Sequence, residues 1–312
     1  MGINYVESAS TNMSDAVRFA PGWPGIPGRW TSSAKTGVGT SASSESRVWF
    51  TLSHGILNEV YFPGVDRACI RDLGFIVSDG VSFVSEEKRD AHATTSQVPP
   101  GVPAYVIHTS DAGGRYRIEK EVIADPRRDV VLQRIRFVPL QGTLADFRLY
   151  ALLAPHLVNC ASGNTAWVGD YKGTPMLFAE RAGWALALAS SAPWLTRSAG
   201  FVGFSDGWRE LRDEKRLLHT YDRAENGNVA LIGEIDLLAS GGVFVLALGF
   251  APSAMEAGQH GILSLMSDFD ELRAEYVGGW QSWHRSLTSH GATGPHRGAD
   301  VVERAMRTGG AV

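Results

Sequence analysis

Apolar and polar residues alternate along most of the chain between positions 35 and 250, the pattern of strands that bury one face. The clearest example begins at 47–52, where every second residue is a large apolar one. A turn of Ser, His and Gly at 53–55 then leads into a second apolar-rich run at 56–62. We predict a β-hairpin there, because two such runs joined by a short turn pair readily.

Further runs of this kind follow at short intervals. Turn signals such as Ala182-Gly183 and Asn226-Gly227 join neighbouring runs directly, which predicts antiparallel pairing in a large, mainly β body. No helix of crossover length separates the runs, which argues against a parallel α/β fold. One short helix is predicted at 205–217, with Ser205 as its cap. The remaining predicted strands are 73–77, 105–109, 116–122, 130–137, 147–153, 176–180, 184–189, 229–237 and 243–250.

The period changes from two to about 3.6 after residue 250. Ser253 with Glu256, and Ser267 with Asp270, have the spacing of helix-capping pairs and predict the starts of two helices. In the second helix a stripe of apolar residues at spacings of three and four must be covered by another part of the protein. Its members are Phe269, Leu272, Tyr276, Trp280, Trp283 and Leu287.

Residues 18–30 are rich in proline and glycine, which excludes a regular helix or a central strand and predicts an extended arm. The arm carries Trp23, Ile26 and Trp30. These side chains could anchor it on a sheet or stack on a sugar, and we expect anchoring because it is the commoner use of tryptophan.

Composition limits the possible partners. The 312 residues include 29 basic and 33 acidic ones without a long run of either sign, so nothing favours nucleic acid or an anionic membrane. No segment approaches the roughly 20 apolar residues of a membrane span. The first residues lack the basic start and apolar centre of a signal peptide, which predicts a cytoplasmic location. Cys69 and Cys160 lack the spacing of paired ligands, and we expect them to be free thiols.

Six long strings carry a family resemblance. They are KTGVGT at 35–40, VWFTLSHGILNEVYFPGVDRACIRDLGFIVSDG at 48–80, APHLVN at 154–159, GNTAWVGDYKGTPMLFAER at 163–181, APWLTRSAGFVGFSDGW at 192–208 and NGNVALIGEIDL at 226–237. They resemble the N-terminal domain of bacterial glucoamylases and glucodextranases, the family 15 glycoside hydrolases. The resemblance implies a large antiparallel two-layer sandwich, a super-sandwich like that of galactose mutarotase.

The same resemblance divides the chain into four parts. Residues 1–19 are expected to be a flexible tail, 20–252 the super-sandwich and 253–290 linker helices. Residues 291–312 would then be the truncated start of an (α/α)6 barrel, which in the family carries the catalytic groups.

Family members hydrolyse α-glucosidic bonds with inversion, using two barrel glutamates held about 6.5–9.5 Å apart. Because the chain stops where that barrel would begin, we expect no catalytic residue, metal or cofactor in it. The predicted function is that of a non-catalytic N-terminal domain supporting the barrel of a glucoamylase-like or glucodextranase-like exo-hydrolase. Two alternatives stay open: a freestanding carbohydrate-binding module, and the N-terminal domain of an inverting disaccharide phosphorylase.

The expected contact residues lie in a Gly-rich segment predicted to be a loop. Polar and aromatic groups occur together there, which suits contact with the barrel first and binding of an α-glucan or glucose oligosaccharide second. The candidates are Asn159, Asn164, Trp167, Asp170 and Tyr171.

The apolar stripe of the last helix gives a second set of candidates. Tyr276, Trp280 and Trp283 are expected to face the barrel and to be partly exposed without it. A mutarotase-type acid–base pair is a weaker hypothesis, because nothing in the spacing brings its components together. Those components would be drawn from His108, His156, His219, Glu59, Glu180 and Glu234.

Overall fold

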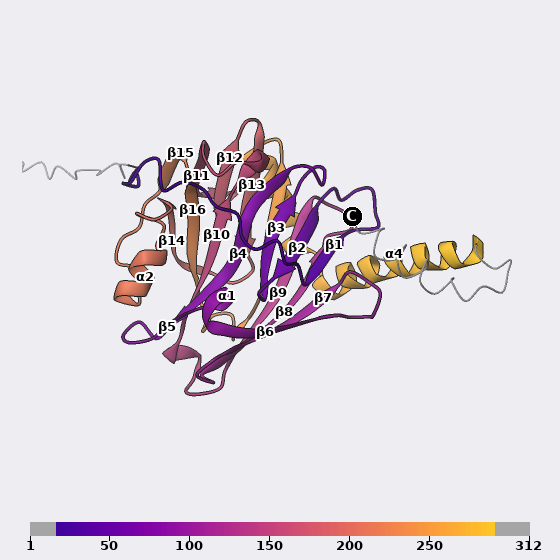
Figure 1. Ribbon diagram of the computed structural model, residues 1–312, viewed down its shortest axis with the longest axis horizontal. Helices are drawn as coiled ribbons and strands as arrows, with labels where there is room; N and C mark the ends of the chain where they lie inside the picture. The colour runs from indigo at the N-terminus through magenta and orange to yellow at the C-terminus, as the bar shows by residue number, and fades with distance from the viewer. Residues whose placement is uncertain (1–16, 291–312) are drawn as a thin grey trace, which may run out of the picture.

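The computed structural model describes residues 17–290, which form two antiparallel sheets that share one core (Figure 1). The eight-stranded sheet has the order β1 (Gly37–Thr40), β2 (Trp49–Ser53), β3 (Ile56–Tyr61), β4 (Ala68–Ser78), β10 (Arg148–Pro155), β16 (Val229–Ile235) and β14 (Trp194–Phe201), with β5 (Val84–Glu86) paired to β4. The nine-stranded sheet has the order β15 (Arg223–Gly227), β11 (Asn164–Tyr171), β12 (Thr174–Arg181), β13 (Trp184–Ser190), β17 (Val243–Ala251), β9 (Val130–Pro139), β8 (Tyr116–Ala124), β7 (Tyr105–Asp111) and β6 (Ala91–Gln97). The predicted antiparallel β-sandwich is confirmed.

Short hairpin turns connect several of these strands. The predicted first hairpin is β2–β3, whose two loop residues are His54 with φ 52° and Gly55 with φ 78°. Lys172-Gly173 joins β11 to β12 and Ala182-Gly183 joins β12 to β13, again with positive φ at both positions. Such turns match the right-handed twist of the strands, so neighbours in sequence become neighbours in the sheet.

The inner faces of both sheets contribute to one continuous core. The rings of Phe62, at the end of β3, and Phe250, on β17, are stacked with their centroids 5.8 Å apart and connect the two layers. Trp184 of β13 contacts Phe62 edge-on. Each large apolar side chain buried in this way contributes about 1.5–3 kcal/mol, so the interface between the sheets is the main source of stability.

A fully buried ion pair interrupts this apolar interface. Lys120 of β8 points inward and binds the carboxylate of Glu87, the first residue of the short helix α1 (Glu87–Asp90). The Lys120 ammonium also donates to the Gly55 carbonyl at 2.5 Å, and the Thr109 hydroxyl donates to Glu87 at 2.9 Å. Burial lowers the pKa of Lys120, and the Glu87 carboxylate opposes this shift. Both charged groups thus have hydrogen-bond partners besides each other, which a buried ion pair needs because it is removed from water.

Two helices cover the outer faces of the sheets. The helix α3 (Ala254–Met266) begins as predicted at Ser253, whose hydroxyl accepts the Glu256 N–H at 3.3 Å, and it packs on β13 and β17. The helix α2 (Trp208–Glu214) lies against the eight-stranded sheet through the buried Leu211. The prediction that Ser205 caps α2 is wrong, because Gly207 occupies the cap position. The short 3-10 helices are η1 (Leu144–Asp146) and η2 (Leu157–Asn159).

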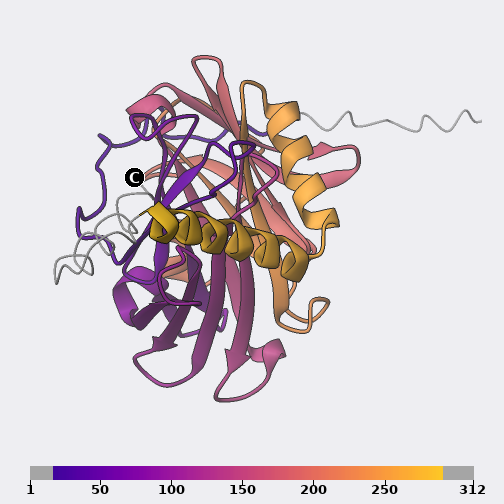
Figure 2. The ribbon, with the colours of Figure 1, turned by 90° about the vertical axis from the view of Figure 1, so that its right-hand side faces the viewer.

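The helix α4 (Phe269–His290) runs across one end of the sandwich, beside α3 (Figure 2). The residue that caps the start of α4 is Asp268 and not the predicted Ser267. The Asp268 carboxylate accepts the Glu271 N–H at 2.9 Å. Ser267 instead ends α3, and its N–H donates to the Ser264 carbonyl. The aspartate is therefore the side chain that satisfies the first turn of α4.

Six strands were not among those predicted, namely β1, β5, β6, β11, β14 and β15. The most consequential is β11, because the segment 159–171 was predicted to be a loop and is mostly a strand paired on both sides. Of the expected tail at 1–19, residues 1–16 lie outside the described residues, and Phe19 forms a parallel bridge with Arg223. The expected barrel start at 291–312 also lies outside them.

Candidate functional site

Asn159 and Asn164, two of the predicted contact residues, have structural roles. The Asn159 side chain accepts from the Ala68 N–H at 2.7 Å and donates to the Asp66 carbonyl at 2.8 Å. The buried Asn164 accepts from the Leu157 N–H and donates to two carbonyls of the loop between β10 and β11. Both amides are thus used to hold that loop in place.

The other three predicted contact residues lie on β11 and point in different directions. Trp167 is stacked on Phe178 at 5.5 Å and belongs, with Tyr171, to the cluster covered by α3. Asp170 is exposed and pairs with Arg197 at 3.3 Å. The five candidates therefore do not form one surface.

Tyr276 and Trp280 of α4 face the sandwich. The Tyr276 hydroxyl lies 2.8 Å from the carbonyl oxygens of Thr40 and Pro103, between which it shares its proton, and the Trp280 N–H donates to Thr40 at 2.9 Å. Both side chains are buried. The sandwich itself therefore covers these two members of the stripe, and Trp283 is the one of the three candidates that is left partly exposed.

Trp283, one turn further along α4, is only partly buried. It contacts Trp280 edge-on at 5.4 Å and borders a groove of about 360 Å³. The groove lies between α4 and the loop that follows β1. Its large lining residues are Glu275, Tyr276 and Trp283, and the others are small, with Ser41, Ala42, Ser43, Pro126, Gly279 and Ser282 among them.

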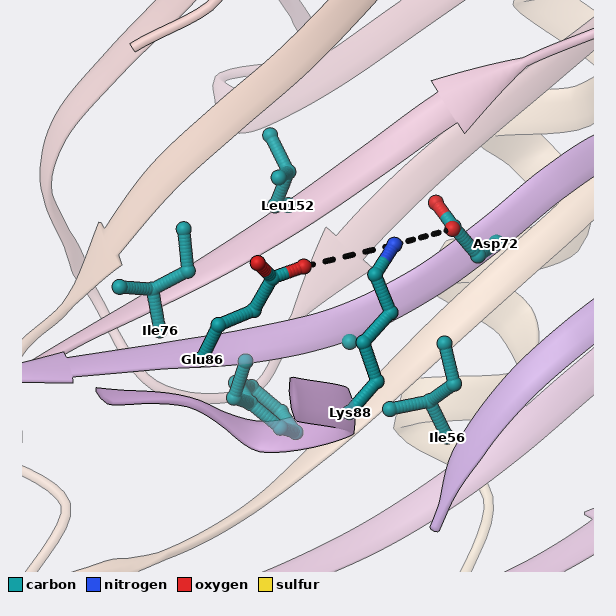
Figure 3. Close-up of a pocket in the computed structure, with 8 residues that line it drawn as sticks. Ile56, Asp72, Ile76, Glu86, Lys88 and Leu152 are labelled. Carbon is teal, nitrogen blue, oxygen red and sulfur yellow. Dashed lines mark hydrogen bonds and ion pairs between the residues drawn. The ribbon is translucent and has the colours of Figure 1, made fainter. Parts of the chain in front are cut away.

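A charged cluster lies on the outer face of β4. The Lys88 ammonium sits between the carboxylates of Asp72, at 2.6 Å, and Glu86, at 3.4 Å (Figure 3). Burial would raise the pKa of Asp72, but Arg71 and Lys88 lower it below its ordinary value. The cavity beside them, of about 10 Å³, has room for a water molecule at most. The cluster therefore joins α1 to β4 and leaves no room for a sugar.

The candidate acid–base residues are dispersed. His108 and Glu180 are exposed on β7 and β12, and His219 pairs with Glu210 on α2 at 2.6 Å. The buried Glu59 and Glu234 bind Lys35 and Arg148, respectively.

His156 lies apart from all of these, beneath the arm. Its ring contacts Trp30 edge-on at 4.8 Å, and neither of its nitrogens has a hydrogen-bond partner among the described residues. Burial, followed by the charge of Arg71, lowers its pKa to about 4. His156 is therefore a neutral packing residue at pH 7.

Two further searches concern the part of the chain from 17 to 290. It contains no group of three or more His, Cys, Asp or Glu side chains placed to hold a metal ion. None of its helices has the length and apolar character needed to cross a bilayer. Cys69 and Cys160 are free, as predicted.

The arm touches the sandwich through the three apolar side chains that were expected to anchor it. The Trp23 N–H donates to the Asn226 carbonyl at 3.1 Å, Ile26 lies against Gly203 and Trp30 contacts His156, while 66%, 45% and 45% of their surfaces stay exposed. Phe204, in the loop after β14, is 57% exposed and lies against Gly22 of the arm. No sequence signal connects Phe204 to the arm, because the contact spans almost two hundred residues.

Comparison with known proteins gives this sandwich a family. Residues 20–285 match the family described as glucodextranase, domain N. The chain belongs to that family. This domain N is 35% identical over 266 residues to a glucoamylase from Clostridium sp. (strain G0005), and it superposes on a bacterial glucoamylase solved with acarbose, at 33% identity and a TM-score of 0.84.

The two relatives are much longer than this chain. The matches cover 85% and 86% of this chain, but only 38% of the Clostridium glucoamylase and 40% of the solved one. Domain N therefore corresponds to the N-terminal part of a glucoamylase-like protein, as the sequence strings indicated.

Proposed function

We propose that this domain N supports the catalytic domain of an inverting exo-hydrolase of α-glucans and takes no part in the chemistry itself. The matched glucoamylases contain well over half of their length outside the matched region, which is enough for a separate catalytic domain. The dispersed histidines and glutamates of the sandwich support a non-catalytic role, because general acid–base catalysis requires groups that meet at one substrate. The strings shared with family 15 favour this reading over a phosphorylase.

The observation that carries the proposal is the contrast along α4. Tyr276 and Trp280 are buried on the sandwich, whereas Trp283, which lines the same groove as Tyr276, is only partly buried. The chain leaves the described region at the end of this same helix. A catalytic domain that follows α4 is therefore well placed to cover Trp283 and the groove.

The test uses the protein encoded by the complete gene, with glucose release from maltooligosaccharides as the first readout. We expect the longer protein to release glucose and the 312-residue chain to release none. Glucose release by the shorter chain would refute the non-catalytic role. No release by the longer protein would refute the assignment as a glucan hydrolase.

The contact through α4 is tested by Trp283→Ala in the longer protein. We expect the midpoint of thermal inactivation to fall by several degrees, while Leu238→Ala, a substitution at an exposed apolar residue elsewhere, leaves it unchanged. The chain has nine tryptophans, so the Trp283 signal is taken as the part of the emission that Trp283→Phe removes. Acrylamide should quench that part less in the longer protein than in the 312-residue chain. Equal quenching and an unchanged midpoint would show that the groove is not the contact.

A further inference from the structure

In the described part of the chain, four strands lie at the ends of the two sheets, and another segment covers three of them. On β1, the Thr40 carbonyl accepts hydrogen bonds from α4. On β15, the Arg223 carbonyl accepts the Ala20 N–H of the arm at 2.8 Å. On β14, the Ala199 N–H donates to the Tyr221 carbonyl at 2.9 Å. These contacts pair backbone groups that a sheet edge would otherwise leave open.

The fourth end strand, β6, has an open edge. Its seven residues pair with β7 in one unbroken register, from Ala91 opposite Asp111 to Gln97 opposite Tyr105. Within the part of the chain that the structure describes, the backbone of 91–97 is hydrogen-bonded to β7 alone. Because alternate residues of an antiparallel strand direct their N–H and C=O groups to opposite sides, about half of these backbone groups face outward.

The sequence of β6 lacks the features with which proteins protect an open edge. Such edges usually carry charged side chains, a proline or a bulge, each of which hinders pairing with another chain. The strand reads AHATTSQ, with no Asp, Glu, Lys, Arg or Pro, and its pairing with β7 shows no register shift. The edge is therefore regular and accessible to a further strand. Five of its side chains are exposed, namely His92, Ala93, Thr94, Ser96 and Gln97.

A second copy of β6 is complementary to this edge. When two copies pair antiparallel about a two-fold axis at Thr94, this residue lies opposite its own counterpart, and Thr–Thr is a favourable cross-strand pair. No two like charges meet anywhere along the seven residues. The other opposed pairs are His92 with the partner's Ser96, Ala93 with the partner's Thr95, and Ala91 with the partner's Gln97.

The chain that follows α4 is a less suitable occupant of the edge. Arg273, near the start of α4, donates to the Val98 carbonyl just after β6 at 3.1 Å. From Arg273 the helix continues to His290, roughly 25 Å further at 1.5 Å per residue. Figure 1 shows it projecting at the right of the molecule. A domain that follows α4 therefore starts well away from the contact between α4 and the end of β6.

We propose that β6 is a self-association edge, at which two copies of this chain pair antiparallel and join their nine-stranded sheets into one continuous sheet. A seven-residue strand buries little surface, so the association belongs to the weak class of interfaces below about 1,200 Å². Because pairing on a two-fold axis uses the free edge of each copy, association stops at the dimer and does not continue into a fibre.

The first test is sedimentation equilibrium of the 312-residue chain over a range of concentrations, where we expect a monomer–dimer equilibrium. Thr94→Lys and Thr94→Glu each oppose two like charges in the dimer alone, and each should raise the dissociation constant about tenfold or more. An equal mixture of the two variants opposes unlike charges and should restore association. Val81→Lys adds the same charge at a residue outside β6 that is 83% exposed, and it should change nothing.

The second test fixes the register by cross-linking. Opposed residues of an antiparallel pair have Cα atoms about 4.5–5.5 Å apart, which a disulfide can span. Thr94→Cys should therefore give a covalent dimer under mild oxidation. The matched control is His92→Cys, also exposed on β6, whose two copies would be about 14 Å apart along the strands and should not cross-link. Both are made with Cys160→Ser, because Cys160 is partly exposed.

Several results would overturn the proposal. These are a monomer at millimolar concentration, a dimer that Thr94→Lys leaves unchanged, or cross-linking of His92→Cys in preference to Thr94→Cys. A dimer of the 312-residue chain that is lost in the longer protein would show that the following domain, and not a second copy, covers the edge. The readouts do not use catalysis, so failure here leaves the glucose-release experiment unaffected. Far-UV circular dichroism of each variant verifies that the fold is retained.

Discussion

His156 is a buried histidine, and the folded protein disfavours its protonated form. It is buried beneath Trp30, with Arg71 and Asp72 of β4 and Asn228 of the loop before β16 around it. Its pKa is lowered from 6.5 to about 4 in the folded protein. Below pH 6.5 the unfolded chain therefore binds a proton that the folded one does not, and the free energy of unfolding decreases until about pH 4.

We predict that His156→Gln removes this contribution. The histidine accounts for a loss of up to about 3 kcal/mol between pH 7 and pH 4. Urea denaturation at both values should show a smaller loss in the variant than in the natural sequence. Asp72 loses its own stabilising charge interactions in acid in both proteins, so the difference between the two is the informative quantity. The same pH dependence in both would contradict the argument.

Single residues also show the limits of prediction from sequence. Cys69 was expected to be a free thiol and is one, with its pKa raised to about 12 by burial. Lys120 has the same register along β8 as the buried Tyr116, Ile118 and Val122, but nothing in the sequence indicates Glu87 as its partner. Trp23 was expected to help anchor the arm, but the sequence could not show that its N–H would bind the Asn226 carbonyl.

At the scale of the elements, periodicity identified most strands, including the doubly buried β13 and β16, but it missed others such as β6 and β11. The β8–β9 pair alternates clearly and was predicted. By contrast, β11 is covered by the core on one side and by α3 on the other, so its apolar residues do not alternate with polar ones. Of the two turn signals, Ala182-Gly183 forms the predicted hairpin between β12 and β13, with positive φ at both positions. The prediction for Asn226-Gly227 is wrong, because these residues end β15, which pairs with β11 and lies in a different sheet from β16.

Close packing of α3 on β17 leads to a prediction about two glycines. A Cβ on Gly249 would lie 2.4 Å from the backbone oxygen of Ala257, whereas one on Gly278 of α4 would meet nothing within 4 Å. Gly249→Ala should push α3 away and cost about 1–3 kcal/mol. Gly278→Ala should stabilise by about 0.5–1 kcal/mol, because glycine is a poor helix former.

Urea denaturation of the two variants checks both signs in one experiment. The substitution is chemically the same in each, so any effect of the extra methyl group on the unfolded chain is shared. If Gly249→Ala were neutral, the close contact between α3 and β17 would not hold in solution.

At the scale of the whole molecule, the sequence predicted the fold more completely than it predicted the functional sites. Alternation and the shared strings led to the sandwich, because the core is formed by regular strands. The arm contacts residues near 204 and 226, which only the folded chain brings beside it. The predicted loop at 159–171 had the right composition for binding, but its side chains serve the structure around them.

The single core also predicts how the protein unfolds. Both sheets contribute to one buried cluster, and Phe269, Leu272, Tyr276 and Trp280 of α4 belong to the same cluster. The helix therefore has no core of its own and cannot separate without exposing the edge of β1. We expect tryptophan fluorescence and far-UV circular dichroism to report one coincident transition in urea, as in a two-state protein. An early loss of helical signal would show that α4 is held by a different part of the protein, and the inference drawn from Trp283 would then lose its basis.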